Sequence, residues 1–303
     1  MRCPADKPEQ VAEPRLVQLT MHFNHRDFIT RAPASVAGWV ACCSIERLPV
    51  LASTARALDD LRPVEDAVDA HMLADEIGTD PLLTLRLLAH VAALRRGRDG
   101  GEPETVTAAL VMLGIPPFFR AFATLDTVEE RLAAHPQAFD GFMRVLRRCR
   151  RAANFAIGFA VHRMDHDAAV IHEAALLHDF AELLLWLHAP TLALDIQARQ
   201  EADPTLRSAA VQRAVLNVEL ADLEHALMRA WRLPQLLVDI TNDHATRATA
   251  QMRNVMLAIR VARHSASGWD NAALPDDLHD VGQLLQMSPD AVQRLLQDID
   301  GDA

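Results

Sequence analysis

HEAALLHDFAELLLWLHAP, residues 172–190, sets the architecture of this chain, and the pair His178-Asp179 lies at its centre. Apolar residues flank the pair on both sides, and a helix that is apolar on nearly all of its faces is a buried helix. We therefore expect one buried helix here, with an imidazole and a carboxylate inside it. An unpartnered buried polar group costs roughly 2–7 kcal/mol. Both side chains consequently need a metal ion, a bound ligand or other side chains as partners.

The composition favours helices, and the helix candidates along the chain predict an all-α protein with more than ten helices. The 303 residues are 50% hydrophobic and include only 11 Gly and no Tyr, a balance that favours helices over sheets around a large core. No long stretch alternates between apolar and polar residues as a strand does. The chain has 30 basic and 41 acidic residues, a formal net charge of -11. Because nucleic-acid-binding proteins usually carry an excess of basic residues, we expect no nucleic-acid partner.

Cysteine usage and hydropathy predict a cytoplasmic protein. The four cysteines include no C-x-x-C pair, and adjacent Cys42 and Cys43 do not bridge easily to each other, so a disulfide framework is not expected. The first residues are polar, without the apolar core of a signal peptide. No apolar run approaches the ~18 residues of a membrane span, so no membrane partner is expected.

Local signals predict several helix boundaries and three segments. Asp80 followed by Pro81 is typical of a helix N-terminus, and Gly114 of a helix end. Further helices are expected at Phe118–Leu125, Phe139–Arg163, Ala209–Trp231 and Met252–His264. The segments are an N-terminal extension (residues 1–44), an N-terminal helical subdomain (45–138) and a second helical subdomain (139–303). Residues 1–20 are expected to form a loose arm, and residues 21–44 to pack on the main body.

Landmarks in fixed order resemble HDOD domains, the HD-related output domains of bacterial signalling proteins. They are IERLPVL (45–51), LADEIGTDPLLTLRLL (73–88), VTAALVMLG (106–114), AALLHDFAELL (174–184), WRLP (231–234) and VMLAIRVA (255–262). The resemblance covers roughly residues 48 to 263. It implies an HD-like helical bundle, related to HD metal-dependent phosphohydrolases, with an N-terminal helical subdomain in front of it.

The metal-ligand set that the resemblance implies is incomplete in this sequence. Arg148 stands where the family has its first ligand histidine, Leu220 where a histidine precedes the W-x-L-P landmark, and Ile259 near the closing aspartate. The histidines after that landmark correspond to Asp243-His244, so one ligand is kept there. A two-metal site needs five or more converging ligands. His178, Asp179 and His244, the residues that would hold a divalent metal if one is bound, are too few, and we expect no resident cofactor.

Two interpretations of the pair follow. It is either a metal or phosphate-ligand site, or a satisfied buried polar pair, which we favour. In the second interpretation Arg148 forms an ion pair with Asp179 across two helices and replaces the metal, since a guanidinium suits a carboxylate in a buried crossing. His178, Asp179, Arg148, His244 and Asp243 are the candidate ligand-binding residues.

Arginines form one face of the helix expected at Phe139–Arg163. Arg144, Arg147, Arg148 and Arg151 share this face at helical spacing, with Arg150 beside them. The face is either an anion pocket, for a nucleotide or an acidic partner, or a solvated surface, which is the commoner case.

Other candidates carry weaker signals. His162 and His166 are spaced four residues apart like a surface metal pair, although a histidine at a helix end also simply favours the helix dipole. Trp186 and Trp231 are expected in the core. Cys42 and Cys43 have no neighbouring base, so a nucleophilic role is unsupported.

Three functions stay open at this point. The preferred one is a non-catalytic bacterial signal-transduction module that binds a partner protein or a small anionic ligand through its HD-derived bundle. The alternative is a residual metal-dependent phosphohydrolase acting on a nucleotide or cyclic nucleotide at His178-Asp179. The third is a homo-oligomeric scaffold that uses residues 21–44.

Overall fold

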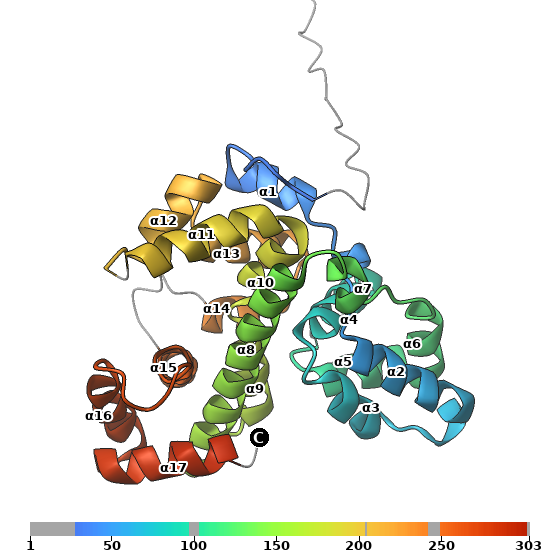
Figure 1. Ribbon diagram of the computed structural model, residues 1–303. Coiled ribbons are helices and arrows are strands. Elements are labelled where there is room, and N and C mark those ends of the chain that lie inside the picture. Colours follow the sequence, from blue (N-terminus) through green and yellow to red (C-terminus); the bar gives the residue numbers. More distant parts are fainter. Residues whose placement is uncertain (1–27, 97–102, 204, 242–248, 302–303) are drawn as a thin grey trace, which may run out of the picture.

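A computed structural model of the protein describes residues 28–96, 103–203, 205–241 and 249–301 (Figure 1). These residues form helices and no strand, so the predicted all-α fold is confirmed. The first group contains α1 (Val36–Cys42), η1 (Ile45–Arg47), α2 (Ala52–Leu61), η2 (Arg62–Ala67), α3 (Ala70–Ile77), α4 (Pro81–Leu94), α5 (Val106–Leu113), α6 (Ile115–Ala121) and α7 (Val128–Leu132). The second contains α8 (Pro136–Arg163), α9 (Ala168–Leu177), α10 (Phe180–His188), α11 (Pro190–Ala202), α12 (Ser208–Leu216), α13 (Leu220–Ala230), α14 (Gln235–Ile240), α15 (Ala250–His264), α16 (Leu274–Leu285) and α17 (Pro289–Gly301).

Asp80 caps α4 as the sequence predicts. Its Oδ1 accepts hydrogen bonds from the backbone N–H groups of Leu82 (3.0 Å) and Leu83 (3.2 Å), and Pro81 lies at the first helical position. The other carboxylate oxygen accepts from the N–H of Leu51 at 2.8 Å. One buried carboxylate therefore satisfies the start of α4 and ties it to the chain just before α2.

The helix expected at Phe118–Leu125 begins and ends earlier. It is α6, which starts at Ile115 directly after Gly114, whose φ of 82° ends α5. Two prolines therefore lie in the first turn of α6 instead of preceding it. The first N–H groups of a helix have no partner within the helix, so proline is tolerated there.

Helix α8 is the central element of the second group. Figure 1 shows α9 and α10 running along it, with α15 and the C-terminal α16 and α17 beside its lower half. Its buried face includes Phe142, Phe155 and Phe159. Gly141 lies against the ring of Trp186, where a Cβ would approach ring atoms to 2.5 Å. Trp186 and Trp231 are both buried, as expected.

The pair His178-Asp179 separates two helices, so the expectation of one helix through residues 172–190 is wrong. Helix α9 ends at Leu177, and Asp179, with φ −104° and ψ 20°, precedes α10 as its N-cap residue. The side chain of Asp179 makes no capping hydrogen bond to α10, because its carboxylate oxygens bind residues of α8 and α15. The apolar pattern continues across the break and hides it from a sequence-based prediction.

The helix expected at Ala209–Trp231 is likewise two helices, α12 and α13. Asn217 ends α12 in the left-handed conformation, with φ 64°. Asparagine is one of the residues that adopt this helix-ending conformation at low cost.

The described part of the N-terminal extension packs on the second group of helices, as predicted. The N–H of Ile29 donates to the carbonyl of His188 at 2.7 Å, and the indole of buried Trp39 donates to the carbonyl of Leu216 at 3.0 Å. The loose arm expected for residues 1–20 lies outside the described residues. No helix in the described part of the chain is long and apolar enough to cross a membrane.

Candidate functional site

Asp179 is held between two arginines from different helices. From α8, Arg148 donates through Nε to Asp179 Oδ2 at 2.9 Å, and from the end of α15, Arg263 donates through Nη2 to Oδ1 at 2.5 Å. A second nitrogen of Arg148 contacts Glu182 at 2.6 Å. The predicted ion pair between Arg148 and Asp179 is therefore present, and Arg263 is a second partner that the sequence analysis did not identify.

This arrangement keeps Asp179 ionised. Burial by itself would raise the pKa of the Asp179 carboxyl, but the charges of Arg263 and Arg148 outweigh it and hold the pKa well below its usual range. Burial likewise works against the charge of Arg148, but Asp179 and Glu182 raise the pKa of its guanidinium above the ordinary value. Two cations around one buried anion form a satisfied network.

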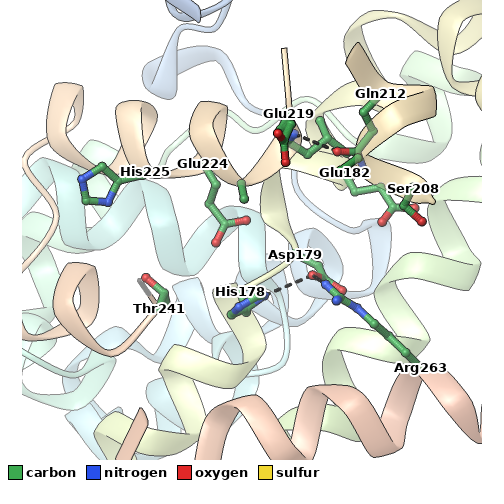
Figure 2. Close-up of a pocket in the computed structure, with 13 residues that line it drawn as sticks. His178, Asp179, Glu182, Ser208, Gln212, Glu219, Glu224, His225, Thr241 and Arg263 are labelled. Carbon is green, nitrogen blue, oxygen red and sulfur yellow. Dashed lines mark hydrogen bonds and ion pairs between the residues drawn. The ribbon is translucent and has the colours of Figure 1, made fainter. Parts of the chain in front are cut away.

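His178 lies next to Asp179 and borders a small cavity. Its Nδ1 is 3.2 Å from Asp179 Oδ1. The cavity, about 200 Å³ in volume, is also lined by Glu224 and Thr241. Figure 2 shows these two residues on the opposite side of His178 from Arg263. Glu224 is buried, and its place in this cavity was not predicted from the sequence.

The described residues do not fit the metal pair of HD phosphohydrolases. Both oxygens of Asp179 accept hydrogen bonds from guanidinium groups, and two fixed positive charges repel a divalent cation at this carboxylate. Within the described ranges, no group of three or more His, Cys, Asp or Glu side chains is arranged to hold a metal ion. The candidates Asp243 and His244 lie outside the described residues.

The resemblance implies metal ligands at two positions that hold apolar residues in this chain, Leu220 and Ile259. Leu220 lines the cavity beside His178, and Ile259 is buried in α15. Glu224 and Arg263 each follow one of these residues by four positions, which is one helical turn on the same face. The sequence signal for Glu224 and Arg263 is therefore a charged residue four positions after each of these apolar residues.

An open cleft of about 880 Å³ runs beside the network and contains the predicted arginine face. The arginines that line it are Arg144, Arg147, Arg148, Arg151 and Arg263, and the carboxylates are Glu182, Glu201 and Asp300. The cleft also has an apolar wall that includes Trp186 and Ile196. Arg150, by contrast, donates to the carbonyl of Thr79 at 2.9 Å and is not part of the cleft lining.

The arginines of the cleft differ in how they are paired. Arg148 and Arg263 bind Asp179, and Arg151 binds both oxygens of Asp300 at 2.7 Å. Arg144 contacts a neutral amide, the Oε1 of Gln197, at 2.6 Å. Arg147 is exposed and has no hydrogen bond or ion pair to any residue in the described part of the chain. Two cationic groups at the cleft wall are therefore not neutralised by a carboxylate.

Three side chains around the predicted pair His162 and His166 are engaged in other contacts. His162 Nε2 lies 3.2 Å from the carbonyl oxygen of Leu285. Of the neighbouring carboxylates, Asp165 pairs with Arg163 at 3.0 Å and Asp167 accepts from the side-chain amide of Gln251 at 2.9 Å.

Cys43 is buried. Its burial and, to a smaller extent, the neighbouring Cys42 raise the pKa of its thiol to about 12, which opposes a nucleophilic role.

Comparisons with known proteins agree with this architecture. A family model described as HDOD domain matches residues 48–247. The MmoQ response regulator from Methylococcus capsulatus str. Bath is similar in structure, with a TM-score of 0.65 and 22% identity, over 84% of this chain and 98% of that chain. A virulence factor from Campylobacter jejuni subsp. jejuni has a TM-score of 0.61 and 18% identity, over 83% and 89% of the two chains. The comparison with curated proteins gave no match. At these identities the structures show a shared fold, and the expected HD-like helical bundle with its N-terminal helical subdomain is confirmed.

Proposed function

The chain belongs to the HDOD family, and we propose that it is a non-catalytic signal-transduction module that binds a small anionic ligand in the arginine cleft. We define the arginine cleft as the open cleft beside α8 that contains Arg144, Arg147, Arg148, Arg151 and Arg263. Ligand binding there is the input, and the helical bundle transmits it to a partner protein. The similar MmoQ protein is described as a response regulator, which agrees with a role in signalling.

The observation that carries this proposal is the unneutralised charge of Arg144 and Arg147. Both arginines line the same cleft, although the protein as a whole has a formal net charge of -11. The volume of about 880 Å³ lies within the range of roughly 300–1,000 Å³ that is typical of small-molecule sites. Arginine recognises phosphate and carboxylate groups by paired hydrogen bonds. Trp186 and Ile196 are buried but border the cleft, and they form part of its apolar lining.

Asp179 supports the structural, non-catalytic side of the proposal. An HD phosphohydrolase requires this carboxylate as a metal ligand, whereas here Arg148 and Arg263 occupy both of its oxygens. We propose that this network fixes the floor of the cleft and sets the orientation of Arg148 and Arg263 toward it. The anionic ligand then contacts a prearranged surface, which reduces the entropic cost of binding.

Calorimetric titration with a panel of nucleotides tests the proposal. The wild-type protein is compared with Arg144→Gln/Arg147→Gln and with the control Arg56→Gln/Arg294→Gln, which removes two exposed arginines that do not line the cleft. We expect at least one nucleotide to bind and Kd to rise at least about 10-fold in the cleft variant, because each charge-assisted hydrogen bond contributes about 1.5–3 kcal/mol. No binding by the wild type, or equal affinity in both variants, contradicts an anion site in the cleft.

A further inference from the structure

A second cavity, separate from the arginine cleft, lies between the two groups of helices. It has a volume of about 310 Å³ and is lined by Ile45 and Glu46 of η1, by α4, by Ala121 and Phe122 at the end of α6, and by the residues that end α13. Trp231 and Arg232 of the W-x-L-P landmark belong to this lining. We call it the junction pocket, because the N-terminal helices form one wall and the C-terminal end of α13 forms the other.

Positive charge is concentrated in the junction pocket. Its lining contains three arginines (Arg86, Arg96 and Arg232) and one carboxylate (Glu46). The protein as a whole has the opposite balance, with 41 acidic and 30 basic residues. Asp126 and Asp80 also act on the charge of Arg86, but basic groups still outnumber acidic ones in the lining. An excess of one sign of charge in a hollow with apolar walls attracts ions of the other sign.

Arg86 is held in place at the inner side of this pocket. It donates through Nη1 to the carbonyl of Leu48 at 2.8 Å, and its guanidinium carbon lies 5.4 Å from the ring centroid of Phe122. Its Nε is buried without a hydrogen-bond partner in the described part of the chain. This nitrogen is closed off from the pocket, so Arg86 contributes there through the positive charge of its guanidinium group.

Arg96 and Arg232 stand at the exposed side of the pocket. Neither has a side-chain hydrogen bond or ion pair to another described residue. Arg232 ends α13 in the left-handed conformation, with φ 56°, and the N–H of Leu233 donates back to the carbonyl of Met228 at 2.9 Å. This helix-ending turn places Arg232 across from α4 in the wall of the pocket.

We infer that the junction pocket is an anion site for a small phosphorylated ligand, bound by Arg96 and Arg232 against the fixed guanidinium of Arg86. The volume of about 310 Å³ suits a compact anion such as a diphosphate group. Its occupant connects η1 and α4 with the end of α13, so binding stabilises the junction between the two groups of helices. This inference does not depend on the arginine cleft.

Calorimetric titration with inorganic pyrophosphate at constant ionic strength tests the inference. The parent protein carries Arg144→Gln and Arg147→Gln, which removes the unneutralised charge of the arginine cleft. Adding Arg96→Gln and Arg232→Asn is expected to weaken saturable pyrophosphate binding at least about 10-fold, since two charge-assisted contacts are lost. Asparagine is chosen at position 232 because it tolerates the left-handed conformation. Adding Arg56→Gln and Arg294→Gln instead is the charge-matched control and leaves Kd unchanged.

Glu46→Gln provides a test in the opposite direction. Removing the carboxylate of the pocket lining is expected to tighten pyrophosphate binding severalfold, a result that misfolding does not produce. The inference is overturned if the parent protein shows no saturable binding, or if the pocket and control variants have the same Kd. Nucleotide binding to the arginine cleft is measured separately, on protein with an intact junction pocket. A negative result for one site therefore leaves the proposal for the other site unaffected.

Discussion

Arg263 Nη2 lies 2.5 Å from Asp179 Oδ1, although the two residues are 84 positions apart in the sequence. The contact joins the end of α15 to the break between α9 and α10, and Arg148 reaches the other oxygen of the same carboxylate from α8. Three segments of the second group of helices are therefore connected by one buried anion. The resemblance to HD phosphohydrolases implies a metal-binding carboxylate at this position, whereas here two guanidinium groups provide the positive charge.

Asp179→Asn is expected to destabilise the protein by about 3 kcal/mol. Breaking a buried ion pair by removing one partner costs about 3–5 kcal/mol, because a charge is left uncompensated. The lower end applies here, since Arg148 keeps Glu182 and Arg263 is partly exposed. Denaturant unfolding followed by circular dichroism measures the change. Asp195→Asn, which removes an exposed pair with Arg199, is the control and shows no measurable loss; equal effects of the two substitutions contradict a structural role of Asp179.

Glu173 predicts an unusual dependence of stability on pH. This glutamate of α9 is buried, and its Oε1 accepts a hydrogen bond from the N–H of Val106, at the start of α5, at 2.6 Å. Burial raises the pKa of its carboxyl to about 8, against a smaller lowering by that hydrogen bond. The folded protein thus holds a proton that the unfolded chain, with a pKa of about 4.3, has already lost. The resulting stabilisation is complete below about pH 4 and is lost as the pH rises to about 8.

Glu173→Gln, which mimics the protonated side chain, is expected to remove this slope. The free energy of unfolding of the wild type, relative to the variant, decreases between pH 5.5 and 8 by at most about 1.4 kcal/mol per pH unit. Urea unfolding at a series of pH values measures the difference. His172, whose pKa is lowered by burial, is present in both proteins and therefore cancels. A constant difference across this range contradicts a protonated Glu173.

Divalent metal ions are expected to leave the melting temperature unchanged. A ligand that binds the folded state raises Tm in proportion to the logarithm of its concentration above Kd. Because guanidinium groups occupy both oxygens of Asp179, manganese has no carboxylate to bind there. Thermal unfolding of untagged protein with and without excess manganese chloride measures this. A concentration-dependent rise in Tm that His178→Ala abolishes supports the metal-dependent phosphohydrolase instead.

Local signals predicted local structure well in this chain. Asp80 and Pro81 identify the start of α4, because a capping carboxylate and a proline at the first helical position act within one turn. The break at Asp179 was not predicted, since the apolar pattern of a buried helix continues through it. Its cause is non-local, because the carboxylate is bound by residues of α8 and α15.

The sequence predicted one of the two arginines that bind Asp179, because contacts between distant helices leave little local signal. Arg148 was identified as the partner of Asp179 from its place in the family pattern, and the structure contains that ion pair. Arg263 is not predicted by the family pattern, because that pattern places the expected aspartate at Ile259, four residues earlier. The arginine side chain is longer than that of an aspartate, so Arg263 reaches Asp179 from one helical turn further along α15.

Gly141→Ala tests how tightly α8 and α10 pack beneath the arginine cleft. A Cβ at this position lies 2.5 Å from the buried ring of Trp186, a rigid group that cannot move aside without disturbing its neighbours. Overpacking a core of this kind costs about 1–3 kcal/mol, which here exceeds the gain of up to about 1 kcal/mol from replacing glycine by alanine in a helix. The net effect on the free energy of unfolding is therefore a loss. Gly301→Ala, at the end of α17, is the matched control, because nothing lies within 4 Å of its Cβ, and it is expected to be neutral or slightly stabilising. If Gly141→Ala is as stable as this control in urea unfolding, then Trp186 is not packed against α8 as the structure shows.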